Sequence, residues 1–210
     1  MNSAIACAIP IFSFILLSGC GATRPSKYYE LTVPREILST TRLSPYQVTL
    51  LIGPILSSPI YRGDRLVYSL KGQAMGWYEY HRWAGPPAEL IAEVLLRQIR
   101  ASGRYRSVHP RRSRFPGDYS LGGRLYDFKE ISDSGLVARL TIEFELRDTK
   151  TGETPWTYFY THDEPVSAKD VSEVVASLNR NVQRALEESI TSLDEYFSTH
   201  FARPEQPGRQ

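Results

Sequence analysis

An alternation of apolar and polar residues from Leu136 to Leu146, interrupted only at Val137, constrains the fold of this chain more than any other feature. Successive side chains of a β-strand point to opposite faces, so this strand has one apolar face and one polar face. The apolar face consists of Leu136, Ala138, Leu140, Ile142, Phe144 and Leu146, and the polar face of Arg139, Thr141, Glu143 and Glu145. The apolar face must be covered by a second layer of structure.

Two segments with helical spacing can supply that layer. After Pro86-Pro87, apolar residues recur at helical spacing and predict a helix over 87–102 that ends at Gly103. Near the C-terminus, an apolar stripe from Val171 to Phe197 continues for about seven turns. This second stripe predicts a long amphipathic helix.

Apolar runs bounded by Gly, Pro and polar turns predict the remaining strands. Besides 136–146, the segments with strand character are 28–31, 47–55, 65–70, 77–81, 106–109, 119–131 and 156–161. Two helices and roughly six strands in the order strands, helix, strands, helix predict an α/β fold, with both helices packed on a mixed sheet. The length of 210 residues suits one such domain.

Charge is absent from the N-terminal segment. All 25 Lys and Arg and all 23 Asp and Glu residues lie between Arg24 and Arg209. Residues 4–17 form an apolar run that is shorter than the roughly 20 residues a membrane-spanning helix needs. A short apolar core followed by small residues is typical of a secretory signal, although no Lys or Arg precedes it here.

The signal ends in Leu17-Ser18-Gly19-Cys20, which resembles the bacterial lipobox. The resemblance implies a diacylglyceryl thioether on Cys20 and cleavage before it. Cys7 is a poorer candidate because the apolar run continues past it. A mature chain that begins at Cys20 has no second thiol for a disulfide. Gly21 in place of Asp resembles the sorting pattern for the outer membrane.

These boundaries divide the chain into four parts. We expect a lipoprotein signal peptide over 1–19, a linker over 20–27, a folded domain over 28–200 and a disordered tail over 201–210. The covalent lipid on Cys20 is the one non-protein group expected, with no cofactor. Two or three acyl chains make membrane attachment close to permanent.

The mature chain also resembles a known family, the ABC-type transport auxiliary lipoproteins of the PqiC/YmbA type. The residues that show the resemblance are the lipobox, Tyr28–Leu31, Val48–Ile55 with its Gly53-Pro54, Tyr61–Tyr68, and His81-Arg82-Trp83-Ala84 before a helix. The resemblance implies a three-layer α/β fold similar to the anticodon-binding-like class. It also implies a lipoprotein of the outer membrane that faces the periplasm.

The partners implied by the resemblance are an MCE-domain protein and its ABC permease and ATPase, which move lipid between membranes, and further copies of the chain in a homo-oligomer. A lipoprotein that activates a cell-wall synthase, and an envelope hydrolase with an unrecognised site, are the alternatives. A net charge of +2 and an envelope location argue against a nucleic-acid partner.

Motifs for chemistry are absent from the sequence. It contains no G-x-x-x-x-G-K-[ST] and no G-x-S-x-G. The four His residues are too widely separated to form a helical metal-binding pair. His162-Asp163-Glu164 is an acid/base candidate, but its position between a strand and Pro165 favours a solvated loop. We therefore expect no enzyme, no metal site and no ATPase.

Two groups of residues are candidates for contact with a partner or with lipid. The first is a basic group, Arg104, Arg106, Arg111 and Arg112, with Arg114 close by, and its alternative is a solvated basic loop. The second is an aromatic group, Trp77, Tyr78, Tyr80 and Trp83, and its alternative is packing beneath the first helix.

Overall fold

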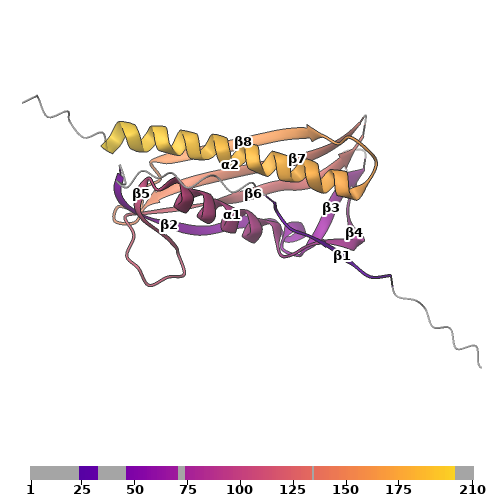
Figure 1. The fold of residues 1–210 in the computed structure, drawn as a ribbon, viewed down its shortest axis with the longest axis horizontal. Helices are drawn as coiled ribbons and strands as arrows, with labels where there is room; N and C mark the ends of the chain where they lie inside the picture. The colour runs from indigo at the N-terminus through magenta and orange to yellow at the C-terminus, as the bar shows by residue number, and fades with distance from the viewer. Residues whose placement is uncertain (1–23, 33–45, 71–73, 134, 202–210) are drawn as a thin grey trace, which may run out of the picture.

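The computed structural model describes residues 24–32, 46–70, 74–133 and 135–201. The predicted signal peptide, the Cys20 anchor and residues 202–210 of the predicted tail lie outside these residues. Phe201, which was predicted to begin the tail, is the last residue of α2. Figure 1 shows an eight-stranded mixed sheet with two helices packed on it, which confirms the predicted α/β class. The elements are β1 Lys27–Tyr29, β2 Tyr46–Ser57, a 3-10 turn Pro59–Tyr61, β3 Arg65–Leu70, β4 Ala74–Trp83, α1 Pro87–Ser102, β5 Tyr105–Pro110, β6 Tyr119–Ser132, β7 Leu136–Asp148, β8 Trp156–Pro165 and α2 Val171–Phe201.

The predicted bounds of the first helix are confirmed. Pro87 occupies the first turn of α1, where its missing N–H leaves no hydrogen bond unmade. Gly103 ends the helix in the left-handed conformation, with φ of 63°, and its N–H donates to the carbonyl of Arg100. Glycine has no Cβ to clash in that conformation, so the ending of α1 is encoded locally.

Strand β6 is the centre of the sheet. β7 pairs with it antiparallel along nearly its whole length, from Tyr119↔Asp148 to Ser132↔Leu136. On its other edge, β2 pairs in parallel with the first half of β6 and β3 with the second half. β2 and β3 therefore lie end to end along one strand. Beyond them, β5 flanks β2 in parallel, β4 flanks β3 antiparallel, and β1 pairs with β4.

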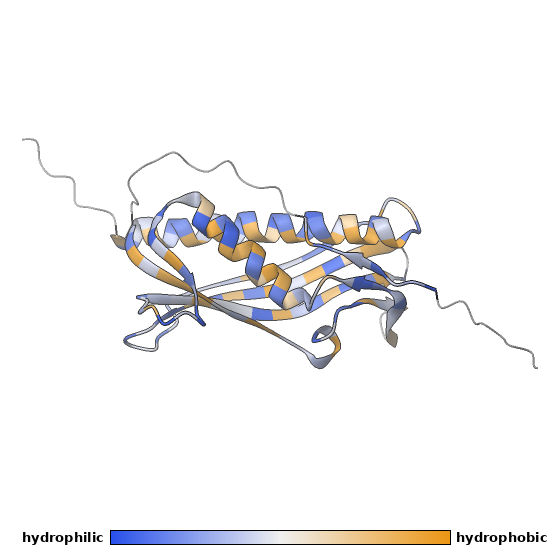
Figure 2. Ribbon diagram, turned by 60° about the horizontal axis from the view of Figure 1, so that its bottom comes forward, coloured by the Kyte–Doolittle hydropathy of each residue, from blue (hydrophilic) through white to orange (hydrophobic). Residues whose placement is uncertain are grey.

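The layering differs from the three layers that the family resemblance implies. α1 packs on β2 and β5, α2 packs on β7 and β8, and the helices also contact each other. Figure 2 shows both helices on the same face of the sheet. The described residues thus form two layers around one core, because a single helical layer covers the apolar side of all the central strands.

The polar side chains of β7, the strand with the alternating pattern, lie on the opposite face of the sheet. Arg139 forms two hydrogen bonds of 2.6 Å with Asp163, and the hydroxyls of Thr141 and Thr161 lie 3.0 Å apart. These are cross-strand pairs between β7 and β8. The alternation predicted from 136–146 is therefore the actual division between core and solvent.

One polar side chain lies inside the core. Asn181 of α2 is fully buried, and its Nδ2 donates to the carbonyls of Ala138 and His162 at 3.0 and 2.9 Å. Its Oδ1 accepts a hydrogen bond of 2.7 Å from the hydroxyl of Tyr160. All its hydrogen-bonding groups are thus used to fix α2 on β7 and β8.

The molecule is elongated, and its two ends differ. The chain enters at the end formed by β1, β3 and β4, where Arg24 precedes β1, and α2 finishes at the opposite end beside β5 (Figure 1). We refer to these as the tether end and the distal end. Within the described ranges, neither helix combines the length and hydropathy required to cross a membrane.

Candidate functional site

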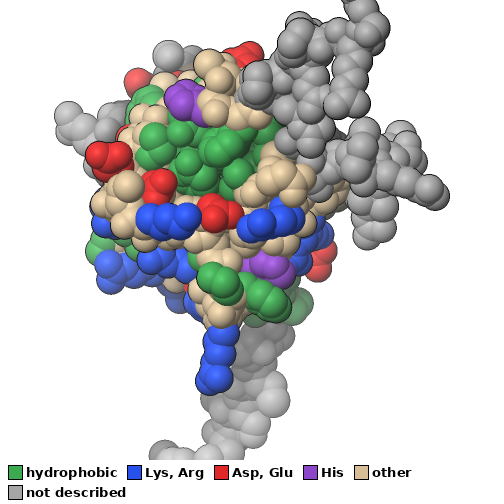
Figure 3. Space-filling view, turned by 90° about the vertical axis from the view of Figure 1, so that its left-hand side faces the viewer, with side chains coloured by type: hydrophobic (Ala, Val, Ile, Leu, Met, Phe, Trp, Pro, Cys, Tyr) green, Lys and Arg blue, Asp and Glu red, His purple; other side chains and the backbone are tan. Residues whose placement is uncertain are grey.

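Six aromatic rings gather at the distal end. We define the distal cluster as Tyr46, Tyr105, Tyr119, Tyr196, Phe197 and Phe201, which come from β2, β5, β6 and α2. Phe197 is fully buried at its centre, with ring centroids 5.3 to 5.6 Å from those of the other five residues. Phe201 is 39% exposed at the rim. Figure 3 shows a hydrophobic patch at this end, bordered by charged side chains.

Asp194 of α2 fixes the buried side of the distal cluster. Its carboxylate forms an ion pair of 2.8 Å with Arg104, and its backbone carbonyl accepts a hydrogen bond of 3.1 Å from the hydroxyl of Tyr46. The hydroxyl of Tyr105 lies 3.4 Å from its Oδ1. Burial, reinforced by the charge of Asp194, raises the pKa of Tyr105, so this hydroxyl stays protonated. The cluster is therefore held rigidly enough to present a preformed surface.

The predicted basic group is divided between two places. Arg104 directly precedes β5 and Arg106 lies on it, beside the distal cluster, and both form ion pairs, Arg106 at 3.3 Å from Asp118. Arg111 and Arg112 follow the end of β5, where they line a pocket. Arg111 donates a hydrogen bond of 2.9 Å to the hydroxyl of Ser120. The group is thus not one continuous basic loop.

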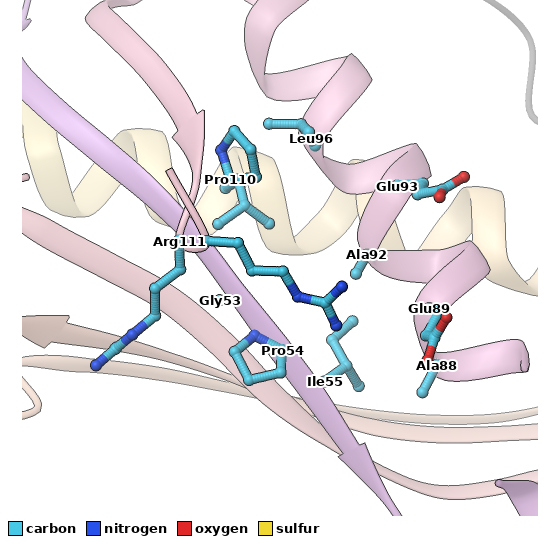
Figure 4. A pocket seen from close by; sticks show the side chains of 12 residues that line it. Gly53, Pro54, Ile55, Ala88, Glu89, Ala92, Glu93, Leu96, Pro110 and Arg111 are labelled. Carbon is cyan, nitrogen blue, oxygen red and sulfur yellow. The ribbon is translucent and has the colours of Figure 1, made fainter. Parts of the chain in front are cut away.

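That pocket has a volume of about 580 Å³ and lies between α1 and β2. Figure 4 shows Ala88, Ala92 and Leu96 on the helix side, facing Pro54, Ile55 and Pro110 on the strand side. A pocket of this size falls within the range of small-ligand sites.

The predicted aromatic group lies at the tether end, far from the distal cluster. Trp77 is 52% exposed, with the Arg65 guanidinium 5.4 Å from its ring centroid. The guanidinium of Arg24 lies 5.6 Å from the ring centroid of Tyr80. Trp83 is 1% exposed and packs in the core against Phe128, with ring centroids 5.1 Å apart, so its side chain is not on the surface. Trp83 is therefore a core side chain, and its ring contact is with β6.

Tyr78, the fourth member of the group, joins a polar network. Its hydroxyl donates a hydrogen bond of 2.6 Å to the buried carboxylate of Glu130, and its ring meets that of His81 edge-on. The Nδ1 of His81 lies 2.9 Å from the hydroxyl of Tyr29 in β1. His81 thereby links the short edge strand β1 to the body of the sheet.

Acidification is expected to weaken this link. Burial lowers the pKa of His81, Lys27 and Arg24 lower it further, and Asp170 opposes them. Because the folded-state pKa lies below the unfolded value of about 6.5, the stability that His81 contributes is complete above that pH and is lost as the pH falls through the folded-state pKa. Between about pH 7.5 and 5.5, the melting temperature of the native chain should therefore fall further than that of His81→Phe. Parallel decreases in the two proteins would contradict the assignment, and His200→Gln, altered at an exposed His, should follow the native chain.

The acid/base candidate His162-Asp163-Glu164 lies in strand β8, so the expectation of a loop was wrong. β8 pairs with Val137 to Leu140 of β7, so the strand continues up to Pro165. The Arg139 hydrogen bond lowers the pKa of Asp163, and burial raises that of Glu164 less than Arg180 and Arg184 lower it. Both carboxylates are therefore ionised and paired. No group of three or more metal-ligating side chains occurs among the residues that the structure describes.

The distal cluster was missed by the sequence analysis because its rings come from four separate elements. The one local signal was that the apolar stripe of α2 ends in Tyr196, Phe197 and Phe201. Their proximity to Tyr46, Tyr105 and Tyr119 depends on the parallel pairing of β2 with β5 and β6. Sequence periodicity contains no information on that pairing.

Solved structures show the same fold. The crystal structure of protein XCC0632 from Xanthomonas campestris, of family DUF330, has a TM-score of 0.69 at 16% identity and covers 84% of this chain and 96% of its own. The crystal structure of an uncharacterized protein has a TM-score of 0.64 at 12% identity and covers 81% of this chain and 99% of its own. The structure of the hypothetical protein CT253 from Chlamydia trachomatis has a TM-score of 0.52 at 9% identity and covers 71% of this chain and 97% of its own. No curated protein matches this chain.

The sequence itself matches one family over most of the folded domain. The match covers residues 29–188, from the end of β1 to just past the middle of α2. The family is described as the ABC-type transport auxiliary lipoprotein component, as the resemblance predicted. This chain therefore belongs to the family of ABC-type transport auxiliary lipoprotein components.

Proposed function

We propose that a lipid on Cys20 anchors this protein in the outer membrane, and that its distal end docks on an MCE-domain protein of an intermembrane lipid transport system. The protein performs no catalysis in this role. It acts as the periplasmic receptor of the assembly, which includes an ABC permease and its ATPase. Family membership supports an auxiliary role in ABC transport.

The proposal rests on one observation, that the tether and the distal cluster lie at opposite ends of the molecule. Arg24, four residues after Cys20, lies at the tether end, and the distal cluster lies at the other end of the long axis. A chain held at one end presents its far end to the periplasm. The exposed ring of Phe201 belongs to this cluster, and Arg104 is held at the cluster by Asp194, which also contacts Tyr46. Exposed aromatic rings together with arginine are typical of protein interfaces.

Co-purification from membranes tests this docking. Full-length tagged protein, extracted in mild detergent, is expected to recover an MCE-domain protein. Phe201→Asp places a charge on the exposed rim of the distal cluster, and we expect it to reduce that recovery about tenfold, which corresponds to about 1.4 kcal/mol of binding energy.

Phe159→Asp is the matched control. Phe159 is an exposed Phe on β8, more accessible than Phe201 at 59% exposure, and it is not part of the distal cluster. Its substitution should leave recovery unchanged. Wild-type protein that recovers no MCE-domain protein, or that recovers a cell-wall synthase in its place, would refute the proposal.

A further inference from the structure

The pocket beside α1 lies in a notch in the edge of the sheet. β5 pairs with β2 only as far as Ile52↔Pro110, whereas β2 continues to Ser57. Farther along the same side of the sheet, the next outer strands are β4 and β1, and they lie beside β3 and not beside β2. Within the described residues, the stretch of β2 from Gly53 onward therefore has no strand on its outer edge, and α1 covers the gap from above (Figure 4).

The walls of the notch are apolar, and its rim is charged. The apolar lining is Ile52, Pro54, Ile55, Ala88, Ala92, Leu96 and Pro110. Arg111 and Arg112 stand where β5 ends, and Glu89 and Glu93 stand on α1. Figure 4 shows one guanidinium group of the two arginines reaching over the pocket toward Ile55 and Ala92, and the Glu93 carboxylate turned away from the pocket.

The charges around this pocket are not neutralised by neighbours. Among the described residues, the side chains of Arg112, Glu89 and Glu93 form no ion pair or hydrogen bond, and Arg111 has only its contact with Ser120. This contrasts with Arg104 and Arg106, which both pair with aspartates. Exposed, unpaired guanidinium groups beside an apolar pocket are suited to an anion that is joined to an apolar group.

An added peptide strand fits the notch poorly. Pro54 has no N–H to donate, and the register of β2 shifts between Ile52 and Ile55, as in a β-bulge. Proline and bulges are the features that protect sheet edges from further strands. An occupant must therefore be held by apolar contact and by charge, without a regular main-chain ladder.

We propose that this notch binds a single acyl chain with an anionic headgroup, a carboxylate or a phosphate, at Arg111 and Arg112. The acyl chain lies between α1 and β2, against Ala92, Leu96 and Ile55. Glu89 and Glu93 on the α1 side repel an anion, so the headgroup is directed to the arginine end. This inference goes beyond the docking role and is independent of it, since the pocket lies away from the distal cluster.

Photolabelling of the full-length lipoprotein in phosphatidylcholine vesicles tests the site. The probes are a diazirine-bearing palmitic acid, a diazirine-bearing lysophosphatidic acid and an alkyl trimethylammonium analogue with the same chain. We expect label from one or both anionic probes on peptides that contain Ala92, Leu96 or Pro110. The anionic probe that labels more strongly identifies the headgroup as carboxylate or phosphate.

Three variants decide the outcome. Ala92→Trp fills the pocket and should abolish the label, and Arg112→Ser should reduce it about tenfold, the effect of losing one charge-assisted contact. Arg114→Ser, in the same loop and outside the pocket lining, should label like the native chain. Because Arg112 is exposed, its substitution should leave the melting temperature of the protein unchanged, and a thermal melt checks this. Equal labelling by the cationic probe, label elsewhere in the chain, or label unchanged by Arg112→Ser would overturn the proposal.

Discussion

Cys20→Ser is expected to move the protein almost completely from the membrane pellet to the supernatant after cell fractionation. The lipid on Cys20 is the proposed anchor, and each methylene of its acyl chains contributes about 0.8 kcal/mol of membrane binding. The helices of the described residues offer no spanning segment in its place. The variant should nevertheless keep its folded domain, which starts after the linker, and should melt at the temperature of the native chain.

Cys7→Ser is the matched control for this experiment. It replaces the other cysteine of the chain, within the predicted signal, and should remain in the pellet. Mass spectrometry of the native protein should find the lipid at position 20 and the first 19 residues removed. A Cys20→Ser protein that stays in the pellet after a carbonate wash would show that the anchor lies elsewhere.

Asn181→Leu should destabilise the domain by about 3 kcal/mol, the largest single-residue effect we expect from the buried polar groups. Leucine is of similar size, so little cavity forms. The substitution instead leaves the buried hydroxyl of Tyr160 and the carbonyls of Ala138 and His162 without their partner. Urea unfolding followed by circular dichroism measures this loss, and the melting temperature should fall by about 10 °C.

Two comparisons separate this network from a general effect of mutation in α2. Asn179→Leu changes the half-buried amide two residues earlier and should cost less than about 1 kcal/mol. Tyr160→Phe in the Asn181→Leu background should restore part of the lost stability, because it removes the orphaned hydroxyl but leaves the two carbonyls without their donor. If the two changes were simply additive, the hydrogen bond between Tyr160 and Asn181 would have no energetic role.

Local chemistry explains what could be predicted from the sequence. The bounds of α1 follow from Pro87 and Gly103, and the two faces of β7 follow from an alternation that needs no distant partner. The α/β class follows from the order of periodic segments. Each helix end and each strand face is set by residues close together in the chain, and the class needs only the order of these segments, so a sequence pattern contains the necessary information.

The remaining features depend on contacts between distant residues. Nothing in the periodicity of 47–55 and 65–70 shows that both pair with one strand, β6. All eight segments with strand character are strands of one sheet, where roughly six were expected, because the short edge strands β1 and β5 are also stabilised by pairing. Asn181 interrupts an apolar stripe, and only its three partners explain why a core position is polar. The division of the predicted arginines likewise results from where β5 ends.

The attachment of β1 has a mechanical consequence. A force between the two membranes would enter the domain through the tether and act first on β1, which contributes only three residues to an outer parallel pair with β4. The rest of the sheet is joined through the long ladder between β6 and β7. Under load, β1 would peel away before the body of the domain unfolds and would lengthen the reach of the anchor. In the proposed arrangement, detachment of the edge strand would thus release the load before it reached the distal end.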